Sequence, residues 1–227
     1  MSPRLNVDSL CGGYGDTVVV DSVSFAIAPG EVLGVLGRNG AGKTTLCRLV
    51  TGALPLGGGR IEVDGEALGD VPAHRRRARG LGYLPQSQPA FDSLSVQENL
   101  SLAPSGCAPD AYFDRFPRLA QRSAQLAGTL SGGERKILGF VRAMCEDTCV
   151  LILDEPSEGV QPENIEHMAA CILERAQAGA SVVLCEQNIG LLRRVSDRFL
   201  GLETGRVAKY GTAEDISESD LRALVAL

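Results

Sequence analysis

The chain has no tryptophan, only two histidines, and no C-x-x-C pair among its seven cysteines. These gaps leave no zinc-ligand pattern, and the odd cysteine count predicts reduced thiols in a cytosol rather than a disulfide framework. No apolar run approaches the roughly 18–20 residues needed to cross a bilayer, and the N-terminal residues lack the apolar core of a signal peptide. The sequence therefore predicts a soluble protein whose link to any membrane runs through a partner.

Positive charge is also scarce. The chain has 22 Lys and Arg against 28 Asp and Glu, a net charge of −6 and a pI of about 5.1. Nucleic-acid-binding surfaces normally show a strong basic excess, so no nucleic-acid partner is predicted. One short basic run at residues 75–79 is interpreted as a solvated helix face, the alternative being a patch that binds phosphate or lipid.

The 227 residues do contain regular strand and helix patterns. Period-two apolar patterns at residues 5–7 and 18–27 predict antiparallel strands, joined by a glycine-rich turn at 11–15, and Asp64–Gly65 predicts a hairpin. Strands that alternate with helices of this length predict a parallel sheet covered on both faces. The expected segments are a strand at 31–36, helices at 44–50, 132–144 and 162–178, and further strands at 149–153 and 181–185.

Residues 86–133 differ in character, because they hold four prolines and only short helical patches, at 96–102 and 112–116. We predict that this segment is a small helical subdomain. It would be inserted into an α/β core made of residues 1–85 and 134–227, the whole chain forming one domain.

Residues 37–44 match the P-loop pattern G-x-x-x-x-G-K-[ST], between an expected strand and an expected helix. Glycines let such a loop wrap tightly, so that backbone N–H groups point at phosphate oxygens. Lys43 can reach the β- and γ-phosphates, and the Thr44 hydroxyl can ligate Mg²⁺. The predicted ATP-binding residues of this segment are Gly37, Asn39, Gly40, Gly42, Lys43, Thr44 and Thr45.

An apolar run at residues 150–153 ends in Asp154 and Glu155. A buried parallel strand delivers its last residues to the carboxyl edge of the sheet, where ligands bind in open α/β folds. Asp154 is predicted to hold Mg²⁺ through water, and Glu155 to orient or deprotonate the attacking water. With the P-loop, these carboxylates predict nucleotide hydrolysis.

Leu130-Ser131-Gly132-Gly133-Glu134 resembles the LSGGQ signature of the ATP-binding-cassette (ABC) ATPases, with Glu in place of the final Gln. A Ser-Gly-Gly turn that opens a helix is a second anion site. The resemblance spans the chain and implies an α/β P-loop NTPase (RecA-like) core with an antiparallel β subdomain and an inserted helical subdomain. It also implies a second ATPase subunit, identical or homologous, so that Ser131, Gly132 and Gly133 of one subunit contact the ATP of the other.

The same resemblance assigns four further positions. Tyr14 matches the aromatic that stacks on adenine, the alternative being an exposed turn tyrosine, and Gln86 matches the glutamine that contacts Mg²⁺ and water at the hinge of the helical subdomain. Residues 157–162 take the place of the loop that crosses to the partner, and depart from its commoner Ser-Ala-Leu-Asp form. Gln187 stands where the family usually has a histidine at the γ-phosphate. Glutamine donates a hydrogen bond but carries no charge and relays no proton, which leaves the rate of hydrolysis open.

Gln187, the Glu-Gly-Val-Gln-Pro of 158–162 and the Phe-Pro-Arg-Leu of 116–119 are similar to one subgroup. Its members power importers of branched-chain amino acids, urea or short-chain amides. This implies transmembrane permease subunits, a peripheral location at the cytoplasmic membrane face and, indirectly, an extracytoplasmic solute-binding protein.

Some alternatives stay open. Phe91, Leu94 and Val96 are candidates for the permease-docking groove or, equally, for the local core of the insert. A soluble ABC ATPase of translation or DNA repair is one alternative function. A non-catalytic nucleotide-binding partner subunit, suggested by Gln187 alone, is another.

Overall fold

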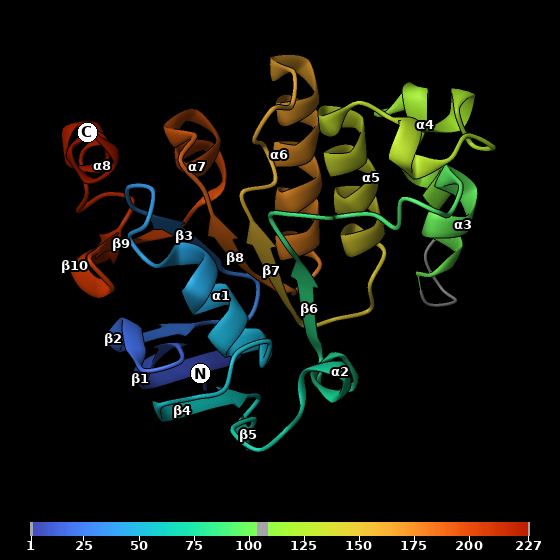
Figure 1. Ribbon diagram of the computed structural model, residues 1–227. Coiled ribbons are helices and arrows are strands. Elements are labelled where there is room, and N and C mark those ends of the chain that lie inside the picture. Colours follow the sequence, from blue (N-terminus) through green and yellow to red (C-terminus); the bar gives the residue numbers. More distant parts are fainter. Residues whose placement is uncertain (1, 104–108, 227) are drawn as a thin grey trace.

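The computed structural model describes residues 2–103 and 109–226, which form two sheets with helices around them (Figure 1). The larger sheet has six strands in the order β10-β9-β3-β8-β7-β6, and the smaller has four in the order β2-β1-β4-β5. The strands are β1 (Leu5–Tyr14), β2 (Thr17–Ile27), β3 (Val32–Leu36), β4 (Gly58–Val63), β5 (Glu66–Ala67), β6 (Leu81–Leu84), β7 (Val150–Asp154), β8 (Ser181–Cys185), β9 (Arg198–Glu203) and β10 (Arg206–Thr212).

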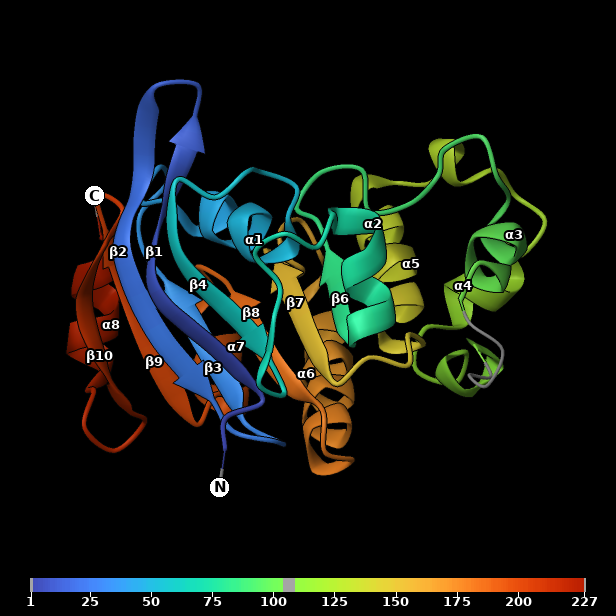
Figure 2. The ribbon, with the colours of Figure 1, turned by 90° about the horizontal axis from the view of Figure 1, so that it is seen from below.

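The helices divide between the two faces of the six-stranded sheet. One face packs on α1 and the four-stranded sheet, and the other packs on α5, α6 and α7 (Figures 1 and 2). The helices are α1 (Lys43–Thr51), α2 (Ala73–Arg76), α3 (Val96–Ser101), α4 (Pro117–Gln121), α5 (Gly132–Met144), α6 (Pro162–Gln177), α7 (Ile189–Val195) and α8 (Glu218–Val225), with 3₁₀ turns η1 (Arg77–Arg79), η2 (Pro109–Tyr112) and η3 (Ala127–Thr129).

The central strands are parallel and buried on both faces, as the sequence predicted. Strand β8 pairs in parallel with β3 and β7, and every residue of these three strands is buried. Successive side chains alternate between the faces. Val150 and Ile152 join the core around α1, whereas Leu151 and Leu153 join the core under α5 and α6. Only β10, at one edge, runs antiparallel to its neighbour.

The antiparallel sheet corrects the predicted turn at residues 11–15. Strand β1 continues to Tyr14 and β2 starts at Thr17, so the reversal involves only Gly15 and Asp16. Register shifts in β1 let its glycines stay paired, and a Cβ on Gly13 would lie 2.0 Å from the Thr17 carbonyl oxygen. The hairpin at Asp64–Gly65 is confirmed, since both residues have positive φ, 50° and 78°.

The proline-rich segment lies to one side of the sheet, with α3 and α4 beside α5 (Figure 1). The short helix predicted at 112–116 is wrong in its position, because the 3₁₀ turn η2 ends at Tyr112 and helix α4 begins at Pro117. Val96, Leu100 and Phe116 share one hydrophobic core with α5. The division at residue 133 stays a prediction, and it would fall inside the first turn of α5.

The three candidate docking residues separate in the structure. Val96 is fully buried and Leu94 is partly buried, but Phe91 is 53% exposed with the Arg142 guanidinium over its ring. Of the three, Phe91 is therefore the most accessible to a partner, and Val96 belongs to the core of the insert. No helix in the described ranges is long and apolar enough to cross a membrane.

The cysteines fit the reduced-thiol prediction only in part. Five described cysteines are free thiols, whereas Cys145 is disulfide-bonded.

The basic run contains a buried arginine, which corrects the solvated-face interpretation. Arg76 is 3% exposed and lies under the C-terminus of α1. Its guanidinium donates to the carbonyl oxygens of Val50 at 2.6 Å, Val71 at 2.8 Å and Leu49 at 3.3 Å. The bond to Val50 satisfies a carbonyl group that the end of α1 leaves unpaired, whereas the Leu49 carbonyl also accepts from the Gly52 N–H. Burial lowers the pKa of Arg76, so desolvation opposes this arrangement.

Replacing Arg76 with leucine is expected to lower the free energy of unfolding by about 2–4 kcal/mol, because buried carbonyl groups lose their donor. Urea unfolding followed by circular dichroism measures the change. Arg75→Leu is the matched control, since Arg75 is exposed, and it should change stability by less than about 0.5 kcal/mol. Equal effects of the two substitutions would contradict the capping role.

Candidate active site

The P-loop connects the end of β3 to α1, and its conformation suits a phosphate. Gly40 and Gly42 have positive φ values of 81° and 105°. Within the described ranges, the backbone N–H groups of Gly40, Gly42, Lys43 and Thr44 have no hydrogen-bond acceptor. The loop closes on itself through the Lys43 ammonium, which donates to the carbonyl oxygen of Gly37 at 2.8 Å. A row of free N–H groups at a helix N-terminus is an anion-binding cradle.

Three oxygen-bearing side chains meet beside this cradle. The Thr44 hydroxyl lies 3.2 Å from the Asp154 carboxylate and 3.4 Å from the Gln86 side-chain oxygen. Thr44 opens α1, Asp154 ends β7, and Gln86 follows β6, so parallel strand ends bring them together. Hydroxyl, carboxylate and amide oxygens are the ligands that Mg²⁺ prefers, and the set fits that ion.

The Glu155 carboxylate is held by donors from three segments. Lys43 Nζ lies 3.3 Å from Oε1, Gln187 Nε2 donates to the same oxygen at 3.0 Å, and Gln86 Nε2 donates to Oε2 at 2.8 Å. The side chains of Lys43 and Glu155 are only 4% and 8% exposed. Glu155 has φ of 49°, in the left-handed region that non-glycine residues rarely adopt and that is often seen at functional sites.

Gln187 joins this network to the P-loop, since Nε2 also donates to Asn39 Oδ1 at 2.8 Å. The structure therefore brings together six of the residues predicted from sequence as catalytic, cofactor-binding or metal-binding groups. These six residues are Asn39, Lys43, Thr44, Gln86, Asp154 and Glu155. Gln187, which contacts two of them, is the seventh predicted residue of the network.

The signature residues lie apart from this network. Ser131 is the N-cap of α5 and forms a capping box with Glu134, whose carboxylate accepts a hydrogen bond from the Ser131 hydroxyl at 2.7 Å. Ser131, Gly132 and Gly133 line a cavity of about 710 Å³ with Glu158 and other residues, none of them from the P-loop. Within one chain, the two predicted phosphate-binding turns therefore open onto different spaces.

Tyr14 also lies outside the network. Its ring is at the end of β1 and is 44% exposed, and its hydroxyl accepts a hydrogen bond from Arg48 of α1 at 3.0 Å. Arg48 follows Thr44 by one helical turn, so Tyr14 is tethered to the P-loop helix with its ring accessible.

Sequence reasoning missed Lys136 of α5. Its ammonium donates to the Glu155 carbonyl oxygen at 2.9 Å and lies 3.2 Å from the Glu158 carboxylate. It thus ties the signature helix to the turn after β7. The available signal was a lysine four residues before the buried Phe140, on the apolar face of a helix.

Glu186 was missed as well. It is 2% exposed, and its carboxylate accepts from the backbone N–H groups of Ser157 at 2.8 Å and Gln187 at 2.9 Å. Glu186 therefore positions the loops that carry the catalytic candidates. Only its place next to Gln187 would have suggested this role.

The electrostatics of the site centre on Asp154, which has no exposed surface. Burial is the largest cause that raises its pKa from 3.8 to about 6, while the hydrogen bond from Thr44 acts in the opposite direction. The nearby charge of Glu155 also raises this pKa. A cation beside Asp154 would relieve both effects.

The fold and this site define a P-loop nucleotide hydrolase. The model of the ABC transporter family matches residues 20–158, more than half of the chain. The chain belongs to the ABC transporter family, as one of its ATP-binding, ATP-hydrolysing subunits. Such subunits dimerise and work with transmembrane permeases.

Two of the proteins similar to this chain are named as branched-chain amino acid transport ATP-binding proteins. The chain is 33% identical to the high-affinity branched-chain amino acid transport ATP-binding protein BraG of Pseudomonas aeruginosa, over 92% of each chain. It is 34% identical to a probable branched-chain amino acid transport ATP-binding protein, LivF, of Archaeoglobus fulgidus, over 95% of each. It is also 31% identical to the lipopolysaccharide export system ATP-binding protein LptB of Escherichia coli, over 95% of this chain and 93% of that protein.

A solved structure of an ATP binding subunit of an ABC transporter has the same fold. It superposes with a TM-score of 0.81 at 29% identity and covers 99% of this chain and 95% of its own. The predicted fold class is confirmed by this match and by the two sheets described above.

Replacing Asp154 with asparagine is expected to raise the free energy of unfolding of the nucleotide-free chain at pH 8 by up to about 3 kcal/mol. The reason is that the folded-state pKa, about 6, exceeds the ordinary 3.8, so folding disfavours the charged carboxylate. This penalty is complete above pH 6, shrinks as the pH falls from 6, and is lost only below the ordinary pKa of 3.8, where the carboxyl is protonated in both states.

Urea unfolding from pH 4 to pH 8 measures the effect, with Asp16→Asn as the control. Asp16 is exposed in the β1–β2 turn, and its substitution should leave the pH dependence unchanged. A stability gain for Asp154→Asn that is the same at pH 4 and pH 8 would contradict the buried-charge explanation.

Proposed function

We propose that two such subunits, either two copies of this chain or this chain and a homologue, enclose two ATP molecules head to tail. One subunit contributes the P-loop network, and the other contributes the signature turn at Ser131–Gly133. The observation that carries the proposal is the separation of these two turns within one chain, since the cavity beside Ser131 contains no P-loop residue. A second subunit would complete each site.

Within each site, Lys43 would bind the β- and γ-phosphates alongside the free N–H groups of the P-loop. Thr44, Asp154 and Gln86 would hold Mg²⁺, whose charge, when it is bound, balances that of the phosphate oxygens. Tyr14, with its accessible ring tethered by Arg48, would stack on the adenine.

Glu155 would take the proton of the attacking water. In the nucleotide-free site its Oε1 is paired with Lys43. A phosphate that draws Lys43 away would leave this oxygen to accept from water, while Gln86 stays within reach of Oε2. The pair would thus link the availability of the base to the presence of the substrate.

Gln187 would donate its amide hydrogen bond to the γ-phosphate from the position it now shares with Asn39 and Glu155. In this arrangement Gln187 contributes a hydrogen bond to the site but no charge. The predicted helical subdomain, with Gln86 at its start, would transmit closure to a permease, and exposed Phe91 is the docking candidate.

We further propose that the transported solute is a branched-chain amino acid, urea or a short-chain amide, imported with the help of an extracytoplasmic solute-binding protein. The subunit would act at the cytoplasmic face of the membrane. Support comes from Gln187 with residues 158–162, and from the names of BraG and LivF. The similarity to LptB, named for export, makes the direction of transport the part that most requires a test.

Glu155→Gln is expected to keep ATP binding but to lower turnover at least about 100-fold, because the water loses its proton acceptor. The ATP-bound dimer should then accumulate and be detected by size-exclusion chromatography with light scattering. Lys43→Ala is the control that should lose both nucleotide binding and the dimer. Normal turnover in Glu155→Gln would exclude Glu155 as the base.

The same variant tests the solute. Cells that carry Glu155→Gln in place of the wild-type chain should lose uptake of labelled leucine, urea or acetamide, and the affected solute identifies the class. Intact uptake of all three, with loss of export of a lipid, would overturn the import proposal.

Gln187→His is expected to raise kcat of the assembled transporter about tenfold. A charge-assisted hydrogen bond from an imidazolium would add roughly 1.4 kcal/mol of transition-state stabilisation. Gln187→Leu, which removes the donor, should lower kcat. Phosphate release assays compare the three forms, and an unchanged kcat in the histidine variant would mean that Gln187 does not limit turnover.

A further inference from the structure

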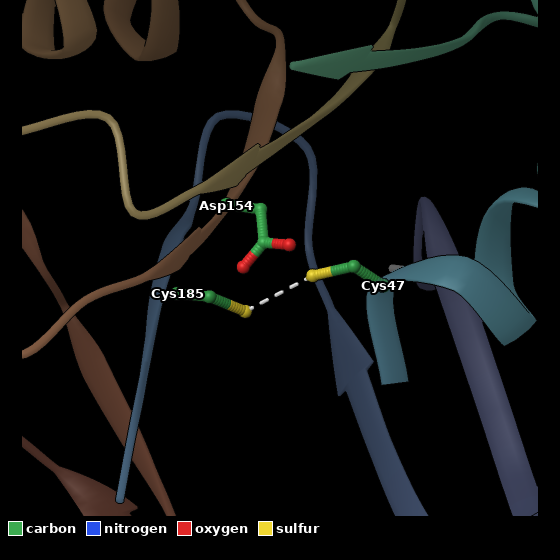
Figure 3. A group of neighbouring side chains, drawn as sticks. All are labelled: Cys47, Asp154 and Cys185. Carbon is green, nitrogen blue, oxygen red and sulfur yellow. Dashed lines mark hydrogen bonds between the residues drawn. The ribbon is translucent and has the colours of Figure 1, made fainter. Parts of the chain in front are cut away.

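A second group of potential metal ligands lies directly beneath the proposed nucleotide site. Figure 3 shows the side chains of Cys47, Asp154 and Cys185 pointing toward one another from α1, β7 and β8. The two Sγ atoms are 3.3 Å apart, and one ligand atom from each residue lies within 4.8 Å of the others. All three side chains are at most 1% exposed.

The fold places these groups together for a definite reason. Asp154 and Cys185 are register partners in the parallel pair β7–β8, so their side chains stand side by side on the α1 face of the sheet. Cys47 follows Thr44 by three residues, and both therefore lie on one face of α1. The Thr44 hydroxyl lies 3.2 Å from Asp154 Oδ1, and Cys47 Sγ lies within 4.8 Å of the same carboxylate.

The contents of this group are unusual for a hydrophobic core. Among the described residues, the hydrogen-bond partner of each thiol sulfur is the other thiol, a weak donor and weak acceptor. Asp154 forms no ion pair with a lysine or arginine of the described residues, although it has no exposed surface. Two soft sulfur atoms and one buried carboxylate oxygen thus converge, and among the described residues none of the three groups forms an ion pair.

We propose that Cys47, Cys185 and Asp154 form a binding site for a thiophilic divalent cation of filled d shell, with Zn²⁺ as the natural occupant and Cd²⁺ as its spectroscopic analogue. Thiolate ligands select such ions over Mg²⁺, which prefers oxygen. Binding releases the two thiol protons to solvent and forms two metal–sulfur bonds and one metal–oxygen bond. Metal–sulfur bonds of about 2.3 Å in tetrahedral geometry place the sulfurs about 3.8 Å apart, so the site need open only slightly.

The site would share Asp154 with the proposed Mg²⁺ position. A cation held by the two sulfurs would draw the carboxylate away from Thr44, and thus from the oxygen set that the proposed function requires. Thiophilic cations would therefore inhibit ATP turnover by occupying the floor of the site. This consequence rests on the proposed function, whereas the binding of the cation does not.

The binding test is a Cd²⁺ titration of the purified, nucleotide-free chain in a thiol-free reductant, followed by thiolate-to-cadmium charge-transfer absorption. The expected result is one high-affinity Cd²⁺ per chain. Cys47→Ala and Cys185→Val should each weaken this binding at least about 100-fold, and Asp154→Asn about tenfold. Cys171→Ala is the matched control, because Cys171 is another buried free thiol and lies on α6. It should bind as the wild type does, and circular dichroism should show that all variants are folded.

Absence of the absorption band, or a band of equal affinity in Cys47→Ala and Cys185→Val, would overturn the proposal. A second measurement keeps it separate from the catalytic assignment. Micromolar Zn²⁺ should inhibit ATP turnover of the wild type, and Cys47→Ala should turn over normally but resist inhibition. Equal inhibition of both forms would also overturn it. A chain that binds Cd²⁺ as expected but has no ATPase activity would contradict the proposed function alone.

Discussion

One carboxylate, that of Glu155, holds the catalytic network of this protein together. The Lys43 ammonium is almost fully buried, and a buried charge without a partner is strongly destabilising. Glu155 supplies the opposite charge and takes further hydrogen bonds from Gln86 and Gln187. Because Gln86 follows β6, Gln187 follows β8 and Lys43 belongs to the P-loop, the Glu155 side chain is the point at which three otherwise separate segments meet.

The backbone of Glu155 is as constrained as its side chain. Its positive φ turns the chain sharply after β7, and its N–H donates to the Cys185 carbonyl oxygen at 2.8 Å. The Lys136 ammonium donates to the Glu155 carbonyl oxygen and also to the Glu158 carboxylate. The signature helix α5 is therefore in direct contact with the turn that carries Glu155. A shift of α5 relative to the sheet would move Glu155 through this contact.

Much of the site could be predicted from the sequence, because its motifs are local and its strands are parallel. The P-loop and the Asp154–Glu155 pair each occur within a few residues, and carboxyl ends of parallel strands share one edge. The predicted boundaries of α5 and β8 are also confirmed to the residue. A capping serine, Ser131, precedes α5, and a short apolar run marks β8.

The remaining features depend on contacts that no local pattern encodes. Cys47 and Cys185 are 138 residues apart, and their sulfurs meet only because α1 packs on the face that β8 turns toward it. Arg76 belongs to a run of arginines whose composition is typical of a surface, but its guanidinium donates to carbonyl groups of another helix. The turn at 11–15 was misplaced because bulges, which the glycines permit, let β1 continue through it.

The alternation of side chains along β7 has one more consequence. Asp154 shares a face with Val150 and Ile152, so a single residue inserted or deleted within the strand would carry the carboxylate to the side of α5 and α6. During evolution, changes of chain length here would thus be confined to the connections outside β7 and β8. The position of the carboxylate therefore depends on the number of residues in this strand as well as on the identity of the acid at its end.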